Sequence, residues 1–470
     1  MRRGAALGLV LFAIAPAASR ADASEWTKPL DITPRDGLTE YMADVAVDRR
    51  GDVAAIGETY SAPDGLVVYS SFDHGPFEGE EVNDSGAEGP AICFDRSGGL
   101  VVLSHKVDFG NAIRVYTRPS GGSFGKAQLL DHRPGYPYGV ATAPNGAVIA
   151  YWTGTDAAGS SSGALRVAVR PAGATAFGPV QDVSEHGLEV EGVQLVFDRA
   201  GNALIAWTVA GRLEYAMRHP GGAFGTPRVL ASAAGYGATH GFAATPAGRA
   251  VAVWRASRGK GHQVRAAFGT VAGGFGGSRR IGGDANRGPY VALDRNGEAV
   301  AAWRIPAGST SELRAAVAEP GADHFGGSRR LDAGYSEPVG VAASHGSATV
   351  AWLDGATLWA ARHARDATGF AEEPVDRSNV RDAALAVTAD GRTVLAWKAS
   401  RKGRRIRVAV ARPARSFGAV RTLTRFARSE SIEGPAVEAG GDGGAFVSWG
   451  TTRETATRDS IWFSGSYLLP

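Results

Sequence analysis

Seven tryptophans recur at the same place in a repeated phrase of this 470-residue chain. Each of them lies six residues after a glycine that ends a short polar turn, and the residues between are mostly apolar. A fixed internal period indicates an array built from one supersecondary unit, so this repeat constrains the fold more than any other feature. The tryptophans are Trp152, Trp207, Trp254, Trp303, Trp352, Trp397 and Trp449.

One unit can be followed strand by strand in residues 291–331. Two apolar runs, 291–293 and 298–303, are joined by Asp-Arg-Asn-Gly, and Asn-Gly supplies the positive φ that a tight hairpin turn needs. We label these two strands A and B. Strand B is apolar on both faces, as in residues 203–207, which predicts that it is buried between neighbouring layers. A third strand, C, and a fourth strand, D, that opens with Phe-Gly complete the unit.

The two ends of the chain are offset by one strand. Nine A-B hairpins occur along the sequence, but the Phe that opens a fourth strand recurs only eight times. The segment 26–33 aligns with 417–424, the fourth strand of the last complete unit, and the chain ends after a third strand near 460–463. The N-terminal strand is therefore expected to complete the last unit.

This offset predicts a closed ring, because sharing one sheet between the two termini locks a circle of units and leaves only short protected edges. We predict an all-β fold, a single β-propeller of about nine four-stranded blades spanning residues 24–470. The first two hairpins carry Gly57 and Ser104 where the others have Trp, and irregular packing is expected there. An eight-bladed ring with one aberrant unit and an open solenoid are the alternatives.

The repeat also resembles known propeller families. Residues 45–53 and 197–203 resemble the hydrophobic-x-hydrophobic-Asp-x-x-Gly core of NHL-type repeats. The Trp that closes strand B is similar to that of sialidase-like, Asp-box propellers, and the whole is typical of bacterial exported repeat proteins. The resemblance covers nearly all of the mature chain and implies the fold, which does not by itself imply a function.

The first 23 residues have the features of a signal peptide. Arg2 and Arg3 precede an apolar run, and Ala21-Asp22-Ala23 is a small-x-small cleavage site. Secretion to the cell exterior or envelope is expected, with no membrane span, because no later run approaches about 20 apolar residues. Residues 1–23 contain three Arg and one Asp, so their removal lowers the net charge from +3 to +1, which argues against a nucleic-acid partner. The single cysteine, Cys93, excludes disulfides within the chain and is expected to be a small buried side chain.

The candidate site lies in the loops from strand D to the next strand A. These loops share one face with the B-C loops, and each places a residue ten positions before the hairpin glycine, near the start of an inner strand. Together these residues are expected to form a polar ring at the channel mouth, with His132, Tyr138, His186 and His240 nearby. Ala238 and Ser336 occupy two of the nine positions, and the candidate ligand-binding residues are Tyr41, Glu88, Tyr136, Glu191, Arg287, Arg381 and Glu433.

Two functions fit these observations. The first is a non-catalytic, monomeric propeller that binds a carbohydrate or protein ligand on this face, and the alternative is a sialidase-like or other glycoside-active enzyme on the same scaffold. Glu88 and Glu191 are the carboxylates that an enzyme would pair, at roughly 5 to 9.5 Å. A scaffold that merely presents loops is a third possibility. No nucleophile, metal or phosphate-loop motif is present in the sequence, so no cofactor and no metal are expected.

Overall fold

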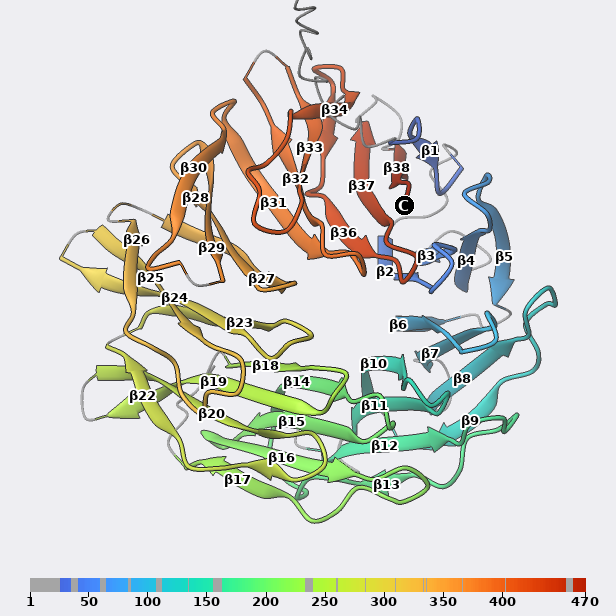
Figure 1. The fold of residues 1–470 in the computed structure, drawn as a ribbon. Helices are drawn as coiled ribbons and strands as arrows, with labels where there is room; N and C mark the ends of the chain where they lie inside the picture. The colour runs from blue at the N-terminus through green and yellow to red at the C-terminus, as the bar shows by residue number, and fades with distance from the viewer. Residues whose placement is uncertain are drawn as a thin grey trace, which may run out of the picture.

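The computed structural model is an all-β ring around a central opening (Figure 1). It describes residues 26–34, 41–59, 65–82, 86–106, 112–133, 135–154, 163–232, 240–258, 261–283, 285–308, 310–332, 334, 336–365, 367–401, 403–453 and 460–470. The predicted signal peptide, residues 1–23, lies outside these residues. The described residues form nine antiparallel sheets, each of which runs outward from the ring axis as one blade. The nine-bladed propeller is therefore confirmed, and the eight-bladed ring and the open solenoid are wrong.

The first four blades have the same order of strands, A to D, from the channel outward. Blade 1 consists of β2 (Tyr41–Val47), β3 (Val53–Thr59), β4 (Gly65–Ser71) and β5 (Glu78–Val82), and blade 2 of β6 (Ala87–Phe94), β7 (Leu100–Lys106), β8 (Ala112–Arg118) and β9 (Gln128–Asp131). Blade 3 consists of β10 (Gly135–Thr142), β11 (Val148–Gly154), β12 (Leu165–Arg170) and β13 (Gln181–Asp182), and blade 4 of β14 (Val190–Phe197), β15 (Ala203–Val209), β16 (Arg212–Arg218) and β17 (Arg228–Ala231).

Blades 5 to 8 repeat this order, with the outermost position of blade 5 divided between two short strands that both pair with β20. Blade 5 consists of β18 (His240–Ala244), β19 (Arg249–Arg258), β20 (Gly261–Thr270), β21 (Gly274–Phe275) and β22 (Arg279–Gly282), and blade 6 of β23 (Arg287–Leu293), β24 (Ala299–Ala307), β25 (Thr310–Ala318) and β26 (Arg329–Asp332). Blade 7 consists of β27 (Ser336–Ser344), β28 (Ser347–Asp354), β29 (Thr357–Ala364) and β30 (Ala371–Asp376), and blade 8 of β31 (Val380–Val387), β32 (Thr393–Ala399), β33 (Arg405–Ala411) and β34 (Arg421–Arg425).

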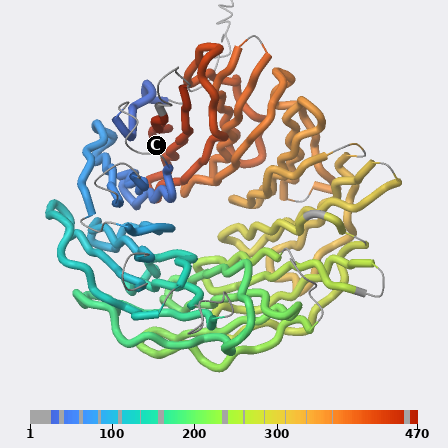
Figure 2. Tube along the Cα trace, turned by 180° about the vertical axis from the view of Figure 1, so that it is seen from behind, coloured from blue at the N-terminus to red at the C-terminus, as the bar shows by residue number. Residues whose placement is uncertain are grey.

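Blade 9 closes the ring with strands from both ends of the chain. Its inner strand is divided into β35 (Glu430–Ile432) and β36 (Ala436–Ala439), followed by β37 (Ala445–Arg453), β38 (Ser460–Leu468) and, outermost, β1 (Leu30–Asp31). Figures 1 and 2 show the blue N-terminal strand beside the red C-terminal one. Trp26 forms a β-bridge with Leu468, and the Ile32 N–H donates to the Phe463 carbonyl at 2.8 Å. The predicted closure is confirmed.

The A-B turns follow from the Asp-x-x-Gly sequence. In blade 2, Asp95 Oδ1 accepts hydrogen bonds from the backbone N–H groups of Ser97 and Gly99, both at 2.9 Å, and Gly98 adopts a φ of 85°. A residue with a β-carbon rarely adopts that conformation, whereas glycine does so at little cost. The Asp side chain thus mimics a backbone acceptor and fixes the turn, so these residues serve the fold.

The recurring tryptophans fill the blades. Six of them, from Trp152 to Trp397 in the repeat, are at most 1 % exposed, and Trp449 is 3 % exposed. The alanines and valines beside them on the B strands are buried on both faces, as the sequence pattern predicted. Burying an aromatic side chain of this size is among the largest favourable terms that one residue can supply. Each Trp packs against the preceding blade, as Trp207 does against Ile149 and Val167 of blade 3, and so joins the two blades.

The two blades without Trp are complete four-stranded sheets with the same strand order as the others. Gly57 and Ser104 stand on the buried strands β3 and β7, where Ile56, Leu66, Val102 and other apolar side chains form a shared core between blades 1 and 2. The irregular packing expected there does not disturb the strand order. No helix able to cross a membrane by length and apolarity is found in the described part of the chain.

Candidate functional site

The candidate residues all belong to the start of an inner strand or its direct surroundings. Because every inner strand runs from its D-A loop to its A-B turn, these residues lie at one end of the channel, which we call the D-A mouth, and the turns lie at the other end, the A-B mouth. Tyr41 and Arg287 are the first residues of β2 and β23. The others are the second residues of their strands (Glu88, Tyr136, Glu191 and Arg381) or, for Glu433, lie between β35 and β36.

An irregularity in the inner strands follows directly after these residues. The A-B pairing shifts register between Met42 and Asp44 in blade 1, and between Glu88 and Ala91 in blade 2. Equivalent shifts occur in blades 3, 4, 6, 7 and 8, and the inner strand of blade 9 is interrupted at this level. A β-bulge bends its strand and re-aims the side chains beside it, and bulges often lie next to binding sites. The bulge therefore separates the D-A mouth from the regular blade below it.

Blades 1 and 3 expose tyrosines at this mouth. Tyr41 is 54 % exposed and Tyr136 is 60 % exposed, while Tyr138 is 39 % exposed. Glu88 and Glu191 are exposed as well. We call these five residues the tyrosine arc. Exposed aromatic rings held on inner strands beside carboxylates form a surface that a polar ligand with an apolar face can occupy.

His105 supports the centre of the arc. It is paired with Glu88 across the β6–β7 ladder, and its ring centroid lies 5.7 Å from that of Tyr136 in an edge-on arrangement. Burial lowers the pKa of His105, and the charge of Glu88 opposes this shift only in part. A neutral imidazole in this position packs against the Tyr136 ring and fixes one edge of it.

Tyr138 ties blade 3 to blade 4. Its hydroxyl donates to the Val190 carbonyl at 2.8 Å, next to Glu191. Burial raises the pKa of Tyr138, and the negative charges of Glu191 and Glu189 raise it further. The hydroxyl therefore keeps its proton at ordinary pH and holds the two blades in register.

The remaining candidates lie outside the arc. Arg381 and Glu433 are exposed on the adjacent blades 8 and 9. Between them, Lys398 forms an ion pair with Asp382 at 2.6 Å and donates to the Ile432 carbonyl at 3.0 Å. Arg287 is opposite Arg304 in the blade 6 ladder. The structure thus brings four of the seven candidates, Tyr41, Glu88, Tyr136 and Glu191, onto four consecutive blades.

In several blades the residue directly after the recurring Trp position contacts the following blade, which the sequence analysis did not anticipate. The Gly89 N–H donates to Glu58 at 2.8 Å, and Thr208 lies 3.1 Å from the His240 ring nitrogen Nδ1. Arg304 pairs with Glu337 at 2.8 Å, so it links blades 6 and 7. In these blades the sequence signal was a polar residue, Glu58, Thr208 or Arg304, at the end of an otherwise apolar strand B.

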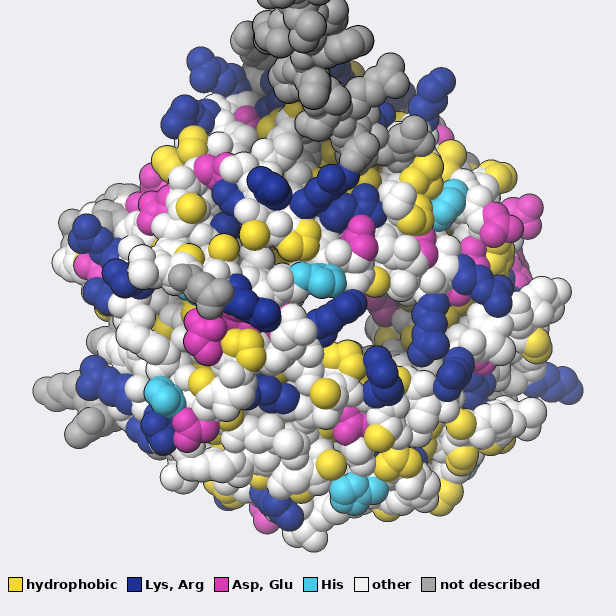
Figure 3. All heavy atoms as spheres, viewed as in Figure 1, with side chains coloured by type: hydrophobic (Ala, Val, Ile, Leu, Met, Phe, Trp, Pro, Cys, Tyr) yellow, Lys and Arg dark blue, Asp and Glu magenta, His cyan; other side chains and the backbone are white. Residues whose placement is uncertain are grey.

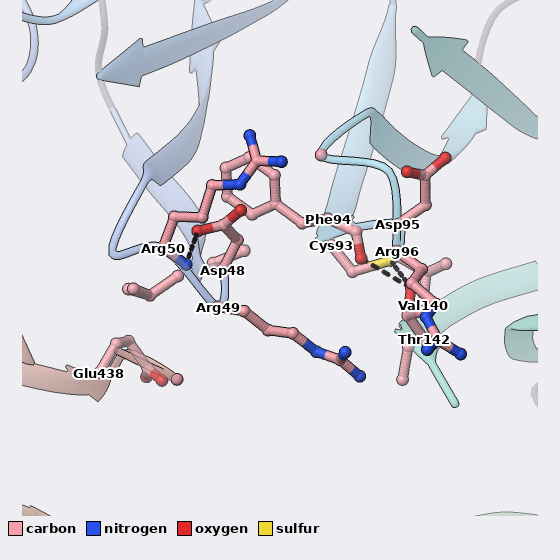
Figure 4. A pocket seen from close by; sticks show the side chains of 15 residues that line it. Asp48, Arg49, Arg50, Cys93, Phe94, Asp95, Arg96, Val140, Thr142 and Glu438 are labelled. Atoms are coloured by element: carbon pink, nitrogen blue, oxygen red, sulfur yellow. Dashed lines mark hydrogen bonds between the residues drawn. The ribbon is translucent and has the colours of Figure 1, made fainter. Parts of the chain in front are cut away.

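The opposite, A-B mouth contains a pocket of about 560 Å³ between the turns of blades 1 and 2 and the inner strands of blades 3 and 9. Arg49, Arg96 and Glu438 line it (Figure 4). Glu438 is exposed to the channel, but the protein atoms around it displace part of its water, and this desolvation, with the negative charge of Asp44 as the second cause, raises its pKa to about 7. Within the described residues, no group of three or more His, Cys, Asp or Glu side chains is placed to hold a metal ion. Cys93, predicted to be buried, is 9 % exposed beside this pocket, and burial raises the pKa of its thiol to about 12.

The chain matches no family model and no curated protein sequence. Among solved structures it is similar to a eukaryotic initiation factor at 10 % identity, covering 84 % of this chain and 90 % of that one, with a TM-score of 0.50. A lectin of Burkholderia pseudomallei is 14 % identical, with 72 % of this chain and 100 % of that chain covered and a TM-score of 0.43. The Dos1 propeller is 9 % identical over 94 % of both chains, with a TM-score of 0.45. Identities this low concern the fold only.

Proposed function

We propose that this protein is an exported binding protein whose tyrosine arc takes a carbohydrate ligand at the D-A mouth. The observation that carries the proposal is the exposure of Tyr41 and Tyr136 on either side of Glu88, on three consecutive blades. Large aromatic side chains are normally buried in the core, and an exposed group of them beside polar residues is typical of a ligand-binding surface.

The chemistry of the arc suits a sugar. A pyranose ring has a face of C–H groups that can pack on a tyrosine ring, while its hydroxyls donate to carboxylates. Glu88 and Glu191 supply acceptors on either side of Tyr136, and the inner strands hold all three at fixed positions. Such preorganisation lowers the conformational entropy that binding has to overcome.

The enzyme alternative gains no support from the placement of its carboxylates. Glu88 stands on blade 2 and Glu191 on blade 4, with the whole of blade 3 between them. Arg304, which begins an Arg-Ile-Pro sequence reminiscent of sialidases, is bound to Glu337 and to the Ser336 carbonyl. Its role is to join two blades, and a substrate carboxylate would have to displace Glu337.

The test is a glycan array followed by calorimetry with the sugars that bind. Tyr136→Ala removes an aromatic surface whose burial stabilises a complex by about 1.5–3 kcal/mol, so the Kd should rise roughly 10- to 100-fold. Phe72→Ala is the matched control, because Phe72 is similarly exposed, at 42 %, but lies on the edge of the ring after β4. Unchanged binding in Tyr136→Ala, or equal losses in both variants, would contradict the proposal.

Turnover is measured on the same sugars. The proposal expects intact glycans after prolonged incubation with the protein. Release of a shorter product by the wild type, together with its loss in Glu88→Ala, would establish the enzyme instead.

A further inference from the structure

The pocket at the A-B mouth is a second, chemically different site. It lies at the far end of the channel from the tyrosine arc, because each inner strand begins at one mouth and ends at the other. Figure 3 shows Lys and Arg side chains gathered around the central opening of the ring. The pocket of about 560 Å³ has Arg49, Arg50 and Arg96 in its wall.

All three arginines keep guanidinium N–H groups that a ligand can bind. All three are exposed, and the guanidinium groups of Arg49 and Arg50 form no ion pair within the part of the chain that the structure describes. Arg96 donates to the Pro144 carbonyl at 3.0 Å through Nη1, which fixes its direction and leaves its other N–H groups. In Figure 4, Arg49 extends in the direction of Arg96.

The nearby carboxylates are already engaged. Asp95 forms an ion pair with Arg170 at 2.9 Å and accepts the hydrogen bonds of its own turn. Asp48 accepts the N–H groups of Arg50 and Asp52 at 2.7 and 3.0 Å. Glu438 enters the pocket from blade 9, on the other side from Arg96. Its raised pKa of about 7 means that it is partly protonated at neutral pH. The free charge in the pocket is therefore positive.

The site depends on two adjacent turns that both carry an arginine at the same position. Blades 1 and 2 have Arg49 and Arg96 two residues before the turn glycine, whereas the adjacent blades have Pro144 and Gly441 there. A β-carbon at Gly441 would lie 2.8 Å from the Arg49 Cα, and the Gly441 N–H donates to the Asp48 carbonyl at 3.1 Å. Glycine at 441 thus lets blade 9 support the Arg49 turn without filling the space in front of it.

We propose that this pocket binds an oxyanion, the sulfate or carboxylate group of an acidic ligand, between Arg49 and Arg96. A guanidinium group presents its N–H donors in a plane that matches two oxygens of such an anion, and two of them facing one pocket make the contact specific. This site is independent of the carbohydrate proposed at the other mouth. An acidic sugar and a free inorganic anion share this chemistry and are distinguished by the test.

The test uses calorimetry of the full chain with sulfate, glucuronate and, as an uncharged blank, methyl glucoside at low ionic strength. Sulfate keeps its charge between pH 5 and 9, so its binding reports only on the protein. We expect sulfate and glucuronate to bind and the blank not to bind at this mouth. Tighter binding of glucuronate identifies an acidic sugar as the ligand class, and tighter binding of sulfate identifies a sulfate group.

The double variant Arg49→Ala/Arg96→Ala should weaken anion binding at least tenfold. Arg295→Ala is the matched control, because Arg295 occupies the same turn position in blade 6, is exposed, and does not line the pocket. Tyr136→Ala should leave anion binding unchanged, which separates this site from the tyrosine arc. The proposal is overturned if neither anion binds the wild type, or if Arg295→Ala weakens binding as much as the double variant does. Thermal unfolding of each variant shows whether its fold is retained.

Discussion

The two mouths of the channel are built under different constraints. At the A-B mouth, the same kind of turn recurs from blade to blade. Its Asp carboxylates accept hydrogen bonds from backbone N–H groups of the turn, as Asp95 and Asp48 show. At the D-A mouth, the corresponding residues vary from Tyr41 to Glu88 to Arg381, and they stay exposed. The repeat therefore specifies one face of the ring and leaves the other to vary from blade to blade.

A binding pocket can form at the A-B mouth even though its turns are alike from blade to blade. At the A-B mouth, the residues that line the pocket project from turns whose shape is fixed by other residues. Arg49 and Arg96 stand at the turn position whose side chain the backbone does not use. Variation at that single position creates a binding surface without a change in the turn.

The largest expected effect lies in the layer between the two mouths. Trp303→Ala removes a fully buried side chain and should lower the free energy of unfolding by about 3–5 kcal/mol. Denaturant unfolding measures it, with Val229→Ala on the exposed outer strand β17 as the control. Equal stability of the two variants would mean that the Trp layer does not join the blades.

The next effect compares the two ends of one strand. Asp95→Ala at the end of β6 removes the acceptor of two backbone N–H groups and the partner of Arg170, which should cost about 1.5–3 kcal/mol. Although partial burial opposes ionisation, the hydrogen bonds from Ser97, Gly99 and Arg170 lower the pKa of Asp95, in keeping with a structural role. Glu88→Ala at the start of the same strand should stay within about 0.5 kcal/mol. If Glu88→Ala proves as costly as Asp95→Ala, the contrast between the mouths fails.

A smaller effect is expected where the D-A mouth does carry a structural contact. Tyr138→Phe removes the hydroxyl that donates to the Val190 carbonyl and should cost about 0.5–1.5 kcal/mol. Calorimetric unfolding of this variant, with Tyr41→Phe as the control for loss of an exposed hydroxyl, measures the difference. No difference would show that this contact does not hold blades 3 and 4 together.

The smallest expected effect is a dependence of the protein's stability on pH, caused by Glu438 at the A-B mouth. Because the folded protein holds the Glu438 proton up to about pH 7 and the unfolded chain loses it near the ordinary pKa of 4.5, stability falls as the pH rises through this window. The Glu438→Gln side chain is an amide that stays uncharged over this pH range, so its contribution to stability does not change with pH. Its melting temperature relative to the wild type should therefore increase between pH 5 and pH 8. Asp44 also faces Glu438 and has a pKa raised mainly by burial, so Asp44→Asn is measured alongside. A constant difference between Glu438→Gln and the wild type would show that Glu438 ionises normally.

Much of the fold was predictable because it depends on patterns among residues close together in the sequence. The Asp-x-x-Gly turns, the apolar B strands and the recurring Trp residues each depend on neighbours within one unit. The closure was predictable from the alignment of Trp26 with Phe417, and the backbone of each residue is bound by a charged side chain on the outer strand of the preceding blade. Arg421 on blade 8 donates to the Trp26 carbonyl, whereas Glu373 on blade 7 accepts from the Phe417 N–H.

The candidate site was predictable only in part. The sequence placed Tyr41, Glu88, Tyr136 and Glu191 at one mouth because all four lie the same number of residues before a turn glycine. It did not predict the bulges behind them, the packing of His105 on Tyr136, or the pocket beside Arg49. These features join residues of different blades.

By itself the sequence determined the strand order within each unit and the way the termini meet, since hairpins and periodic burial arise from residues close together in the chain. It left the number of blades at eight or nine. Only the tertiary structure decided which side chains of separate blades come together, because that depends on the twist of each sheet and the angle between neighbouring blades. The repeat along the chain does not predict the angle between neighbouring blades. For this reason the ring and the residues at its D-A mouth could be predicted from the repeat, while the pocket at the A-B mouth was revealed only by the tertiary structure.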